Sequence, residues 1–206
     1  MKLVLASGNP GKLAELQAMF SPLGLTLVNQ SSLGISEAEE PFHTFVENAL
    51  TKARHASALS GLPAVADDAG LCVDVFGGQP GVQTAFYAMR FGYPKGDANN
   101  VRALLEQMQG VANRRASMVS TLVALLSADD PQPLVAVGRV VGEIASEPRG
   151  EQGFGFDPVM FIPEFGQTFA QMPPALKHAT SHRGRAAQTM VAMMRENWPL
   201  ARSEAI

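Results

Sequence analysis

Two adjacent carboxylates, Asp67 and Asp68, interrupt an otherwise apolar stretch and constrain the fold more than any other feature of the chain. The apolar run 62–66 precedes them, and a second apolar run begins at Leu71. We predict a strand, a turn and a second strand, with both acids at the turn. Because neighbouring side chains of a strand point to opposite faces, the two acids serve different purposes unless the turn re-aims one of them. Carboxylates at an apolar strand end are costly without hydrogen bonds or a metal, so the segment is either a solvated turn or a metal site.

The composition is that of a folded domain of moderate size. The chain has 206 residues, of which 46% are hydrophobic, enough for a sizeable core. Its net charge of −3 argues against a general nucleic-acid binder, and no apolar run approaches the ~20 residues that cross a membrane. The single cysteine, Cys72, excludes an internal disulfide framework and fits a reducing cytosol. We therefore expect a cytoplasmic protein that has neither nucleic acid nor membrane as a partner.

The N-terminal segment predicts a strand, a glycine-containing turn and a helix. Residues 2–6 are apolar, residues 7–12 read Ser-Gly-Asn-Pro-Gly-Lys, and residues 13–20 carry apolar side chains at helical spacing. This order can present backbone N–H groups and a helix N-terminus to an anion, with Lys12 supplying positive charge. It is not a Walker A loop, because the glycines are too close together and Leu13 stands where a hydroxyl would bind magnesium. A plain turn is the alternative.

An acidic run at 36–41 precedes the best-defined helix of the chain. Thr44 and Glu47 form a capping-box pattern at its start, and Gly61 follows its predicted last residue, Ser60. The acidic run taken alone is typical of a solvated loop. Beside the small-residue face of the helix, a polar stripe at helical spacing contains Asn48, Lys52 and His55.

The second half of the chain predicts further strands and helices. Residues 25–29 and 159–162 are short strand candidates, and residues 97–109 form a helix that Asp97 can cap. Two β-rich runs, 117–126 and 133–145, predict an antiparallel hairpin.

A loop rich in glycine and aromatic residues occupies 148–158. The ring of Phe154 can stack on a planar ligand while Asp157 accepts hydrogen bonds. The alternative is a tight turn whose aromatic residues belong to the core. Downstream, Ser181 is a natural N-cap, which puts His182 and Arg183 in the first turn of the last helix. Cations there oppose the helix dipole, which favours a ligand that carries hydrogen-bond acceptors.

Six motifs in the same order make the chain resemble the inosine triphosphate pyrophosphatase family, also called the Ham1 family. The similarity covers residues 3 to about 190. The segments that carry it are Ser7–Lys12, Thr44–Ala49, Ala66–Leu71, Gly77–Val82, the glycine-rich stretch Pro148–Pro158 and Ser181–Gly184.

The resemblance implies a magnesium-dependent hydrolase that cleaves ITP, dITP, XTP and dXTP to the monophosphate and pyrophosphate and so cleanses the nucleotide pool. It implies an α/β fold: a long twisted mixed sheet flanked by helices, with two lobes around a central cleft in residues 1–200, followed by a tail at 201–206. It also implies a homodimer.

The same resemblance implies roles for individual residues. Asp68 would be the general base and would hold Mg²⁺ together with Glu39 or, slightly favoured, Glu40. Lys12 and Asp68 would be the catalytic pair. The remaining residues would bind substrate: Ser7, Gly8, Asn9, Pro10, Gly11, Lys12 and Ala69 near the phosphates, and Phe154, Gly155, Phe156, Asp157, Lys177, His182 and Arg183 around the base and ribose.

Three positions depart from the family pattern. Ala69 stands where a serine is common, Phe86 where an arginine is usual, and Gln171 where a glutamate is usual. These changes bear on turnover and dimer contacts, while the proposed base, the metal ligands and Lys12 are all retained. Two alternatives stay open: a related Maf-type pyrophosphatase acting on other nucleoside triphosphates, and a nucleotide-binding sensor without activity.

Overall fold

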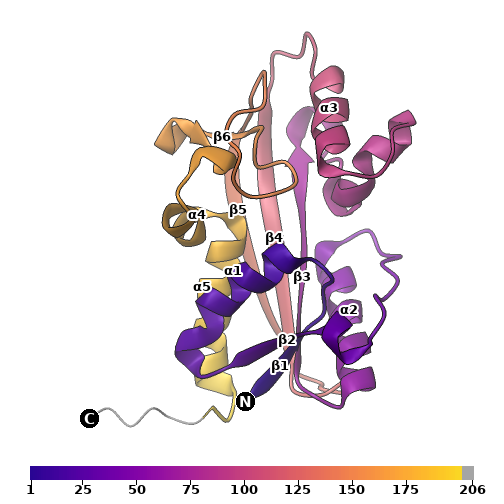
Figure 1. The fold of residues 1–206 in the computed structure, drawn as a ribbon, viewed down its shortest axis with the longest axis vertical. Coiled ribbons are helices and arrows are strands. Elements are labelled where there is room, and N and C mark those ends of the chain that lie inside the picture. The colour runs from indigo at the N-terminus through magenta and orange to yellow at the C-terminus, as the bar shows by residue number, and fades with distance from the viewer. Residues whose placement is uncertain (201–206) are drawn as a thin grey trace. The chain divides into compact units, whose positions relative to one another are not determined.

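The computed structural model describes residues 1–200; the predicted tail, 201–206, lies outside the described residues. Figure 1 labels the main elements. The strands are β1 Lys2–Leu5, β2 Thr26–Asn29, β3 Ala64–Val73, β4 Arg115–Leu125, β5 Leu134–Ile144, β6 Met160–Ile162 and β7 Gln167–Thr168. The α-helices are α1 Pro10–Phe20, α2 Phe45–Ser60, α3 Asp97–Gln107, α4 Pro174–Thr180 and α5 His182–Asn197.

The strands form one mixed sheet of seven strands in the order β2-β1-β3-β4-β5-β6-β7. Strand β1 runs parallel to β2 and β3, whereas β6 runs antiparallel to β5 and β7. The predicted α/β class with a mixed sheet is thereby confirmed. Among residues 1–200, none of the helices has the length and apolar character needed to span a bilayer.

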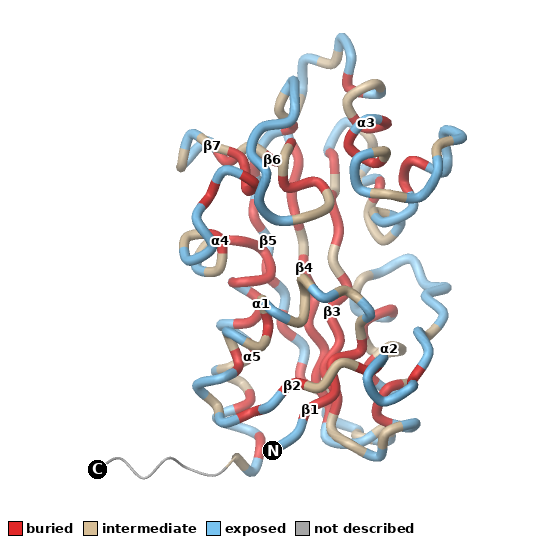
Figure 2. The backbone as a smooth tube through the Cα atoms, viewed as in Figure 1, coloured by how far each residue is buried: buried red, intermediate tan, exposed pale blue. Residues whose placement is uncertain are grey.

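The chain divides into two compact units. Each of the strands β3, β4 and β5 has residues in both units. Among the described residues, unit 1 comprises 1–68, 121–138 and 184–200, and unit 2 comprises 69–120 and 139–183. Each unit has its own buried apolar cluster or clusters, which Figure 2 shows as buried segments along the strands.

In unit 1 the side chains of β1 alternate between two apolar layers. Leu3 and Leu5 pack with residues of α1 and α5, while Val4 packs with the alanine face of α2, which includes Ala49 and Ala53. This alternation follows from the period of two along a strand, and it places helices on both faces of the parallel strands.

In unit 2 one core cluster joins strands to α3. Leu71 of β3 and Val140 of β5 pack with Val101 and Leu104 of α3 and with Phe156 from the glycine-rich loop. The loop is therefore built directly on the core of this unit.

The helix boundaries follow their sequence signals closely. Thr44 caps α2 by accepting a hydrogen bond from the Glu47 N–H, and Gly61 ends the helix in the left-handed conformation with φ 68°. Helix α3 is different, because its N-cap is Gly96 and Asp97 lies in the first turn. The predicted capping role of Asp97 is therefore wrong.

The prediction of a turn at Asp67 and Asp68 is also wrong. Strand β3 runs without interruption from Ala64 to Val73, and both acids are buried within it. The two carboxylates do not have to reach solvent, because each of them forms an ion pair with a lysine inside the fold.

Candidate functional site

The two acids of β3 bind two different lysines. Lys12 Nζ lies 3.1 Å from Asp67 Oδ2, and Lys52 Nζ lies 2.7 Å from Asp68 Oδ1. Asp67 is fully buried and Asp68 is 6% exposed. Burying a carboxylate is costly unless it is paired and hydrogen-bonded, and the two lysines meet that requirement.

Both lysines converge on one backbone oxygen. Lys12 Nζ donates to the Asp67 carbonyl at 3.0 Å, and Lys52 Nζ donates to the same oxygen at 3.3 Å. Lys12 comes from the first turn of α1 and Lys52 from the middle of α2, so side chains of two helices converge on one residue of β3. We call the group Lys12, Glu40, Lys52, Asp67 and Asp68 the lysine–carboxylate cluster.

Helix α2 fixes the acidic run that carries Glu40. Lys52 Nζ lies 2.9 Å from Glu40 Oε2, so one ammonium group bridges Glu40 and Asp68. One turn earlier, Asn48 binds both backbone groups of Phe42, and one turn later His55 Nε2 contacts the Ser36 carbonyl at 3.0 Å. The polar stripe of α2 thus holds the segment 36–42 at three points, two of them in the acidic run. Both Glu39 and Glu40 are exposed, but Glu40 shares a lysine with Asp68.

The ionisation of the cluster follows from burial and mutual charge. Burial raises the pKa of Asp68 to about 6; Lys52 opposes this rise and Glu40 adds to it. Burial is the largest effect on the pKa of Glu40 and acts to raise it, but the charge and hydrogen bond of Lys52, together with Asp68 and Lys12, leave that pKa below its ordinary value. The pKa of Lys52 is raised, because Asp68 and Glu40 outweigh the effect of burial. Asp68 is therefore the cluster member poised to exchange a proton near neutral pH.

The cluster fits a magnesium ion. Asp68 Oδ2 is buried and has no hydrogen-bond partner among residues 1–200, so one carboxylate oxygen is available to a cation. No group of three or more acidic, histidine or cysteine side chains in the described chain is arranged to hold a metal. Magnesium does not require one, because it takes one or two carboxylates together with phosphate oxygens and water.

The predicted anion turn is capped by its own side chains. Asn9 is the N-cap of α1, and its Oδ1 accepts from the N–H groups of Gly11 at 2.8 Å and Lys12 at 3.3 Å. Ser7 Oγ accepts from the Asn9 N–H, and Pro10, the first residue of the helix, has no N–H. The amides of Gly11 and Lys12 are thus engaged by Asn9, and anion binding by this turn stays a prediction.

Gly8 lies against the acidic run. A Cβ atom at this position would lie 2.7 Å from Glu37 Oε1, closer than real Cβ contacts allow. The exposed Glu37 side chain would have to move to make room for that atom, so Gly8 lets the turn and the acidic run lie close together in unit 1.

A second group of predicted residues comes together in unit 2. Lys177 Nζ lies 2.7 Å from Asp157 Oδ2, and both side chains are almost fully buried. The half-buried ring of Phe154 has Lys177 Nζ 5.1 Å and the Arg183 guanidinium 5.3 Å from its centroid. We call Phe154, Asp157, Lys177 and Arg183 the aromatic-loop cluster. It combines a flat apolar surface with two cations, which suits a planar ligand that carries hydrogen-bond acceptors.

Two predicted ligand contacts lie deeper in the structure than expected. The Phe156 ring is 1% exposed, belongs to the core of unit 2 and packs edge-on to Tyr87. Its side chain supports the loop from the core side, which corrects the prediction that this ring lines the ligand pocket. His182 is 2% exposed, and its ring lies 6.0 Å from that of Phe169.

The structure gives local reasons for the departures from the family pattern. The exposed Phe86 ring carries Lys95 Nζ 4.4 Å from its centroid, so a cation is present at this surface although the usual arginine is absent. Gln171 Oε1 accepts from the Thr168 N–H at 3.0 Å in a capping box, a task that needs only a neutral acceptor. Ala69 is half-buried on β3 directly after Asp68.

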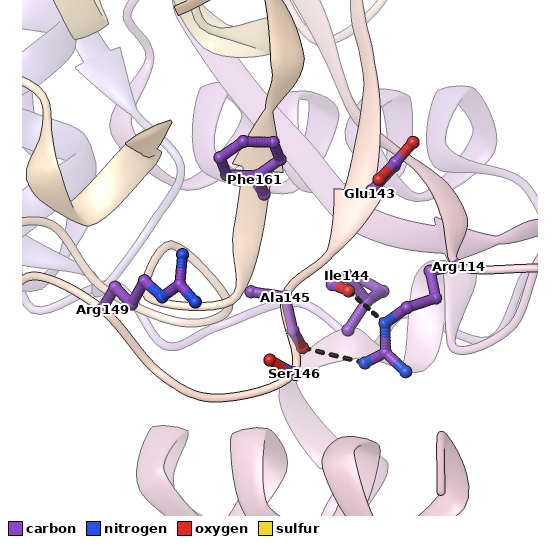
Figure 3. A pocket seen from close by; sticks show the side chains of 7 residues that line it. All are labelled: Arg114, Glu143, Ile144, Ala145, Ser146, Arg149 and Phe161. Atoms are coloured by element: carbon purple, nitrogen blue, oxygen red, sulfur yellow. Dashed lines mark hydrogen bonds between the residues drawn. The ribbon is translucent and has the colours of Figure 1, made fainter. Parts of the chain in front are cut away.

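A hollow in unit 2 is lined by residues that hold strand ends together. It has a volume of about 220 Å³ and is lined by Arg114, Glu143, Ile144, Ala145, Ser146, Arg149 and Phe161 (Figure 3). The Arg114 guanidinium donates to the carbonyls of Ile144, Ala145 and Met108, so its charge ties the ends of β4 and β5 together. None of the predicted substrate or metal residues lines this hollow.

Comparison with known proteins identifies the family. The model of the Ham1 family matches residues 3–193. The chain belongs to the Ham1 family. A relative from Paracidovorax citrulli, named dITP/XTP pyrophosphatase, is 77% identical over 96% of this chain and 100% of its own length. A relative of the same name from Albidiferax ferrireducens is 74% identical over the same shares. The solved structure of a Ham1 protein from Coxiella burnetii superposes with a TM-score of 0.87 at 39% identity, covering 95% of this chain and 99% of that one.

Sequence reasoning missed two members of the lysine–carboxylate cluster. In the sequence Lys52 stands out only as part of a polar stripe, and Asp67 only as the neighbour of Asp68. The stripe itself is the available signal: polar residues at positions 48, 52 and 55 sit beside a face of small residues that packs on the sheet. Such a stripe lies next to the buried face of the helix. Its side chains can therefore contact polar residues of the strands on which the helix packs.

Proposed function

We propose that the protein hydrolyses dITP and XTP, together with ITP and dXTP, to the nucleoside monophosphate and pyrophosphate. The substrate class is supported by relatives named dITP/XTP pyrophosphatase that are 77% and 74% identical to this chain over nearly its whole length. The reaction is supported chiefly by one observation: Asp68 is buried, with one oxygen on Lys52 and the other without a hydrogen-bond partner in the described chain.

In this proposal Asp68 is the general base. It accepts a proton from a water molecule whose oxygen forms a bond to the α-phosphorus. The bond from that phosphorus to the oxygen bridging the α- and β-phosphates breaks, and pyrophosphate leaves with the bridging oxygen. A carboxyl group with a pKa of about 6 is ionised at pH 7 to 8 and is a stronger base than an ordinary aspartate. Lys12 and Lys52 offset the charge that develops on the triphosphate oxygens, and their partners on β3 hold them in place before substrate arrives.

Asp68 and Glu40 would hold Mg²⁺. When bound, the ion supplies positive charge to the phosphate oxygens and lowers the pKa of a bound water. Lys52 contacts both carboxylates, so its position would also decide how they are oriented toward the ion.

The aromatic-loop cluster supplies a means of discrimination. Hypoxanthine and xanthine carry a keto oxygen at the position where adenine carries an amino group. Donors of Arg183 or His182 can bind that oxygen and would be left unpaired against adenine. Buried donors left unpaired can reject a substrate by ~10⁴. Phe154 would support the base through its ring face.

The test is a panel of nucleoside triphosphates with Mg²⁺. We expect pyrophosphate from dITP and XTP, no release of single phosphates, and turnover of dATP, dTTP and UTP lower by several orders of magnitude. A preference for dTTP or UTP would favour the Maf-type alternative. Tight ITP binding without turnover would favour the inactive sensor, which the departures at Ala69, Phe86 and Gln171 would then explain.

We further propose that the enzyme acts as a homodimer in the cytoplasm and removes deaminated purine nucleotides there. Sedimentation of the purified chain would test the first part of this proposal.

A further inference from the structure

The aromatic loop holds Phe154 between two glycines in the left-handed conformation. Gly153 has φ 79° and Gly155 has φ 63°. A Cβ at Gly153 would overlap the Asp157 carboxylate, so the loop wraps closely around that acid. Backbone of this kind has few stabilising contacts of its own and needs partners that fix each peptide plane.

Two carboxylates supply those partners. The Phe154 N–H donates to Asp157 Oδ2 at 2.9 Å, and the next amide, that of Gly155, donates to Asp97 Oδ2 at 2.8 Å. Asp157 is buried and also binds Lys177. Asp97 is exposed and lies 58 positions earlier in the chain.

Asp97 stands on a well-anchored helix. It lies in the first turn of α3, whose Val101 and Leu104 are buried in the core of unit 2. Within the same helix the buried Asn100 accepts from the Ala88 N–H at 2.9 Å. A side chain on such a rigid helix can restrain the position of a loop to which it is hydrogen-bonded.

We propose that Asp97 is a positioning residue for nucleobase recognition, which acts by fixing the Gly155 amide and, through it, the plane of the Phe154 ring. This inference rests on the proposed function, because it assigns the aromatic loop to the base. Charge-assisted hydrogen bonds to backbone amides are among the stronger ones, although the exposure of Asp97 reduces the effect. We expect its loss to weaken base binding about tenfold and to leave the phosphate-binding residues unaffected.

The competing explanation is that Asp97 only stabilises α3. An acid in the first turn of a helix interacts favourably with the helix dipole, so its removal can lower stability without any role in binding. The experiment must therefore separate ligand binding from folding.

Three variants of the full chain make this separation: Asp97→Ala, Asp97→Asn and, as the matched control, Asn99→Ala. Asn99 lies in the same helix turn, and its side-chain amide donates to the Pro94 carbonyl at 2.9 Å. Its removal therefore perturbs the start of α3 without touching the Gly155 amide. For each variant we would measure kcat and KM for dITP, inhibition constants for IMP and for inorganic triphosphate, and the melting temperature.

For Asp97→Ala we expect KM for dITP and the inhibition constant of IMP to rise about tenfold, with kcat within about twofold of wild type and the inhibition constant of inorganic triphosphate unchanged. Asp97→Asn keeps an acceptor oxygen and should recover most of the lost affinity. Asn99→Ala should keep the wild-type KM even where its melting temperature falls.

Equal KM values for Asp97→Ala and wild type would overturn the inference, as would a parallel loss of affinity for IMP and inorganic triphosphate that follows the melting temperature. If Asp97→Ala does not fold, Asp97→Ser replaces it, because serine is tolerated at a helix start but has no carboxylate and a shorter side chain; a wild-type KM in Asp97→Ser overturns the inference equally. A wild-type enzyme that fails to hydrolyse dITP refutes the proposed function itself, whereas an active wild type with an unaffected Asp97→Ala refutes only the role of Asp97.

Discussion

The lysine–carboxylate cluster of unit 1 and the aromatic-loop cluster of unit 2 both pair acids with cations, but they do so in different ways. In unit 1, Lys52 binds two carboxylates, and Asp68 retains one oxygen without a hydrogen-bond partner in the described chain. In unit 2, Asp157 is shared between a lysine and a backbone amide, and the cations lie against an aromatic ring.

The difference teaches what each cluster can do. An acid with a pKa of about 6 and an available oxygen can exchange a proton or bind a cation, so the first cluster is suited to chemistry. An acid that holds a loop and a lysine in place, beside a half-buried ring, is suited to recognition. Changes in the first cluster should therefore lower kcat, and changes in the second should raise KM.

The largest effect is expected for Asp68→Asn. Loss of the proposed general base and of one proposed metal ligand should lower kcat for dITP by about 10³-fold or more, while dITP binding stays measurable. The assay is pyrophosphate release with Mg²⁺. Asp129→Asn, an exposed acid in the loop between β4 and β5, is the matched control and should have wild-type activity. Unchanged turnover in Asp68→Asn would remove this residue from the mechanism.

The family motif implies a role for Asp68, which stays a prediction, but the surroundings of this residue could not be predicted from the sequence. Local signals located the ends of α2 well, since Thr44 and Gly61 act on neighbouring backbone groups. The uninterrupted β3 was missed because two acids in a row suggest contact with solvent. The lysines that satisfy them are 16 and 55 positions away in the sequence, so no local pattern shows the pairing. The core position of Phe156 and the contact between Asp97 and Gly155 are likewise products of tertiary packing.

Lys52→Met should have the next largest effect. It removes the ammonium group that bridges Glu40 and Asp68, leaving two carboxylates close together without their common partner. We expect kcat to fall about 10²-fold. We also expect the pKa of Asp68 to rise further, because in the wild-type chain the charge of Lys52 lowers that pKa. The pH–rate profile measures both effects. Arg54→Ala, an exposed cation on the same helix, is the control; a normal kcat in Lys52→Met would show that the bridge is dispensable.

The third prediction concerns pH in the absence of metal. Asp68 binds its proton more tightly in the folded chain, with a pKa of about 6, than at its ordinary value of 3.8. Its contribution to stability is therefore complete below about pH 3.8 and is lost as the pH rises through about 6, a change of about 3 kcal/mol. Denaturant unfolding across this range gives the free energy of unfolding of wild type and of Asp68→Asn. We expect the wild-type value to fall relative to that of the variant as the pH rises through about 6. Mg²⁺ affinity should change the opposite way, strengthening as the pH rises through about 6; a pH-independent difference in stability would contradict the assignment.

The smallest effect is expected in unit 2, from Phe154→Ala. The ring is half-buried and contacts two cations, so its loss should raise KM for dITP about tenfold and change kcat and stability little. Phe91→Ala, which removes an exposed ring from the 3₁₀ segment Gly81–Phe91, should not change KM. Phe156→Ala provides the contrast two positions away: it removes a core ring and should cost about 3–5 kcal/mol of stability. A fall in kcat for Phe154→Ala without a change in KM would break the division of chemistry and recognition between the two clusters, because the ring would then act on the reacting groups.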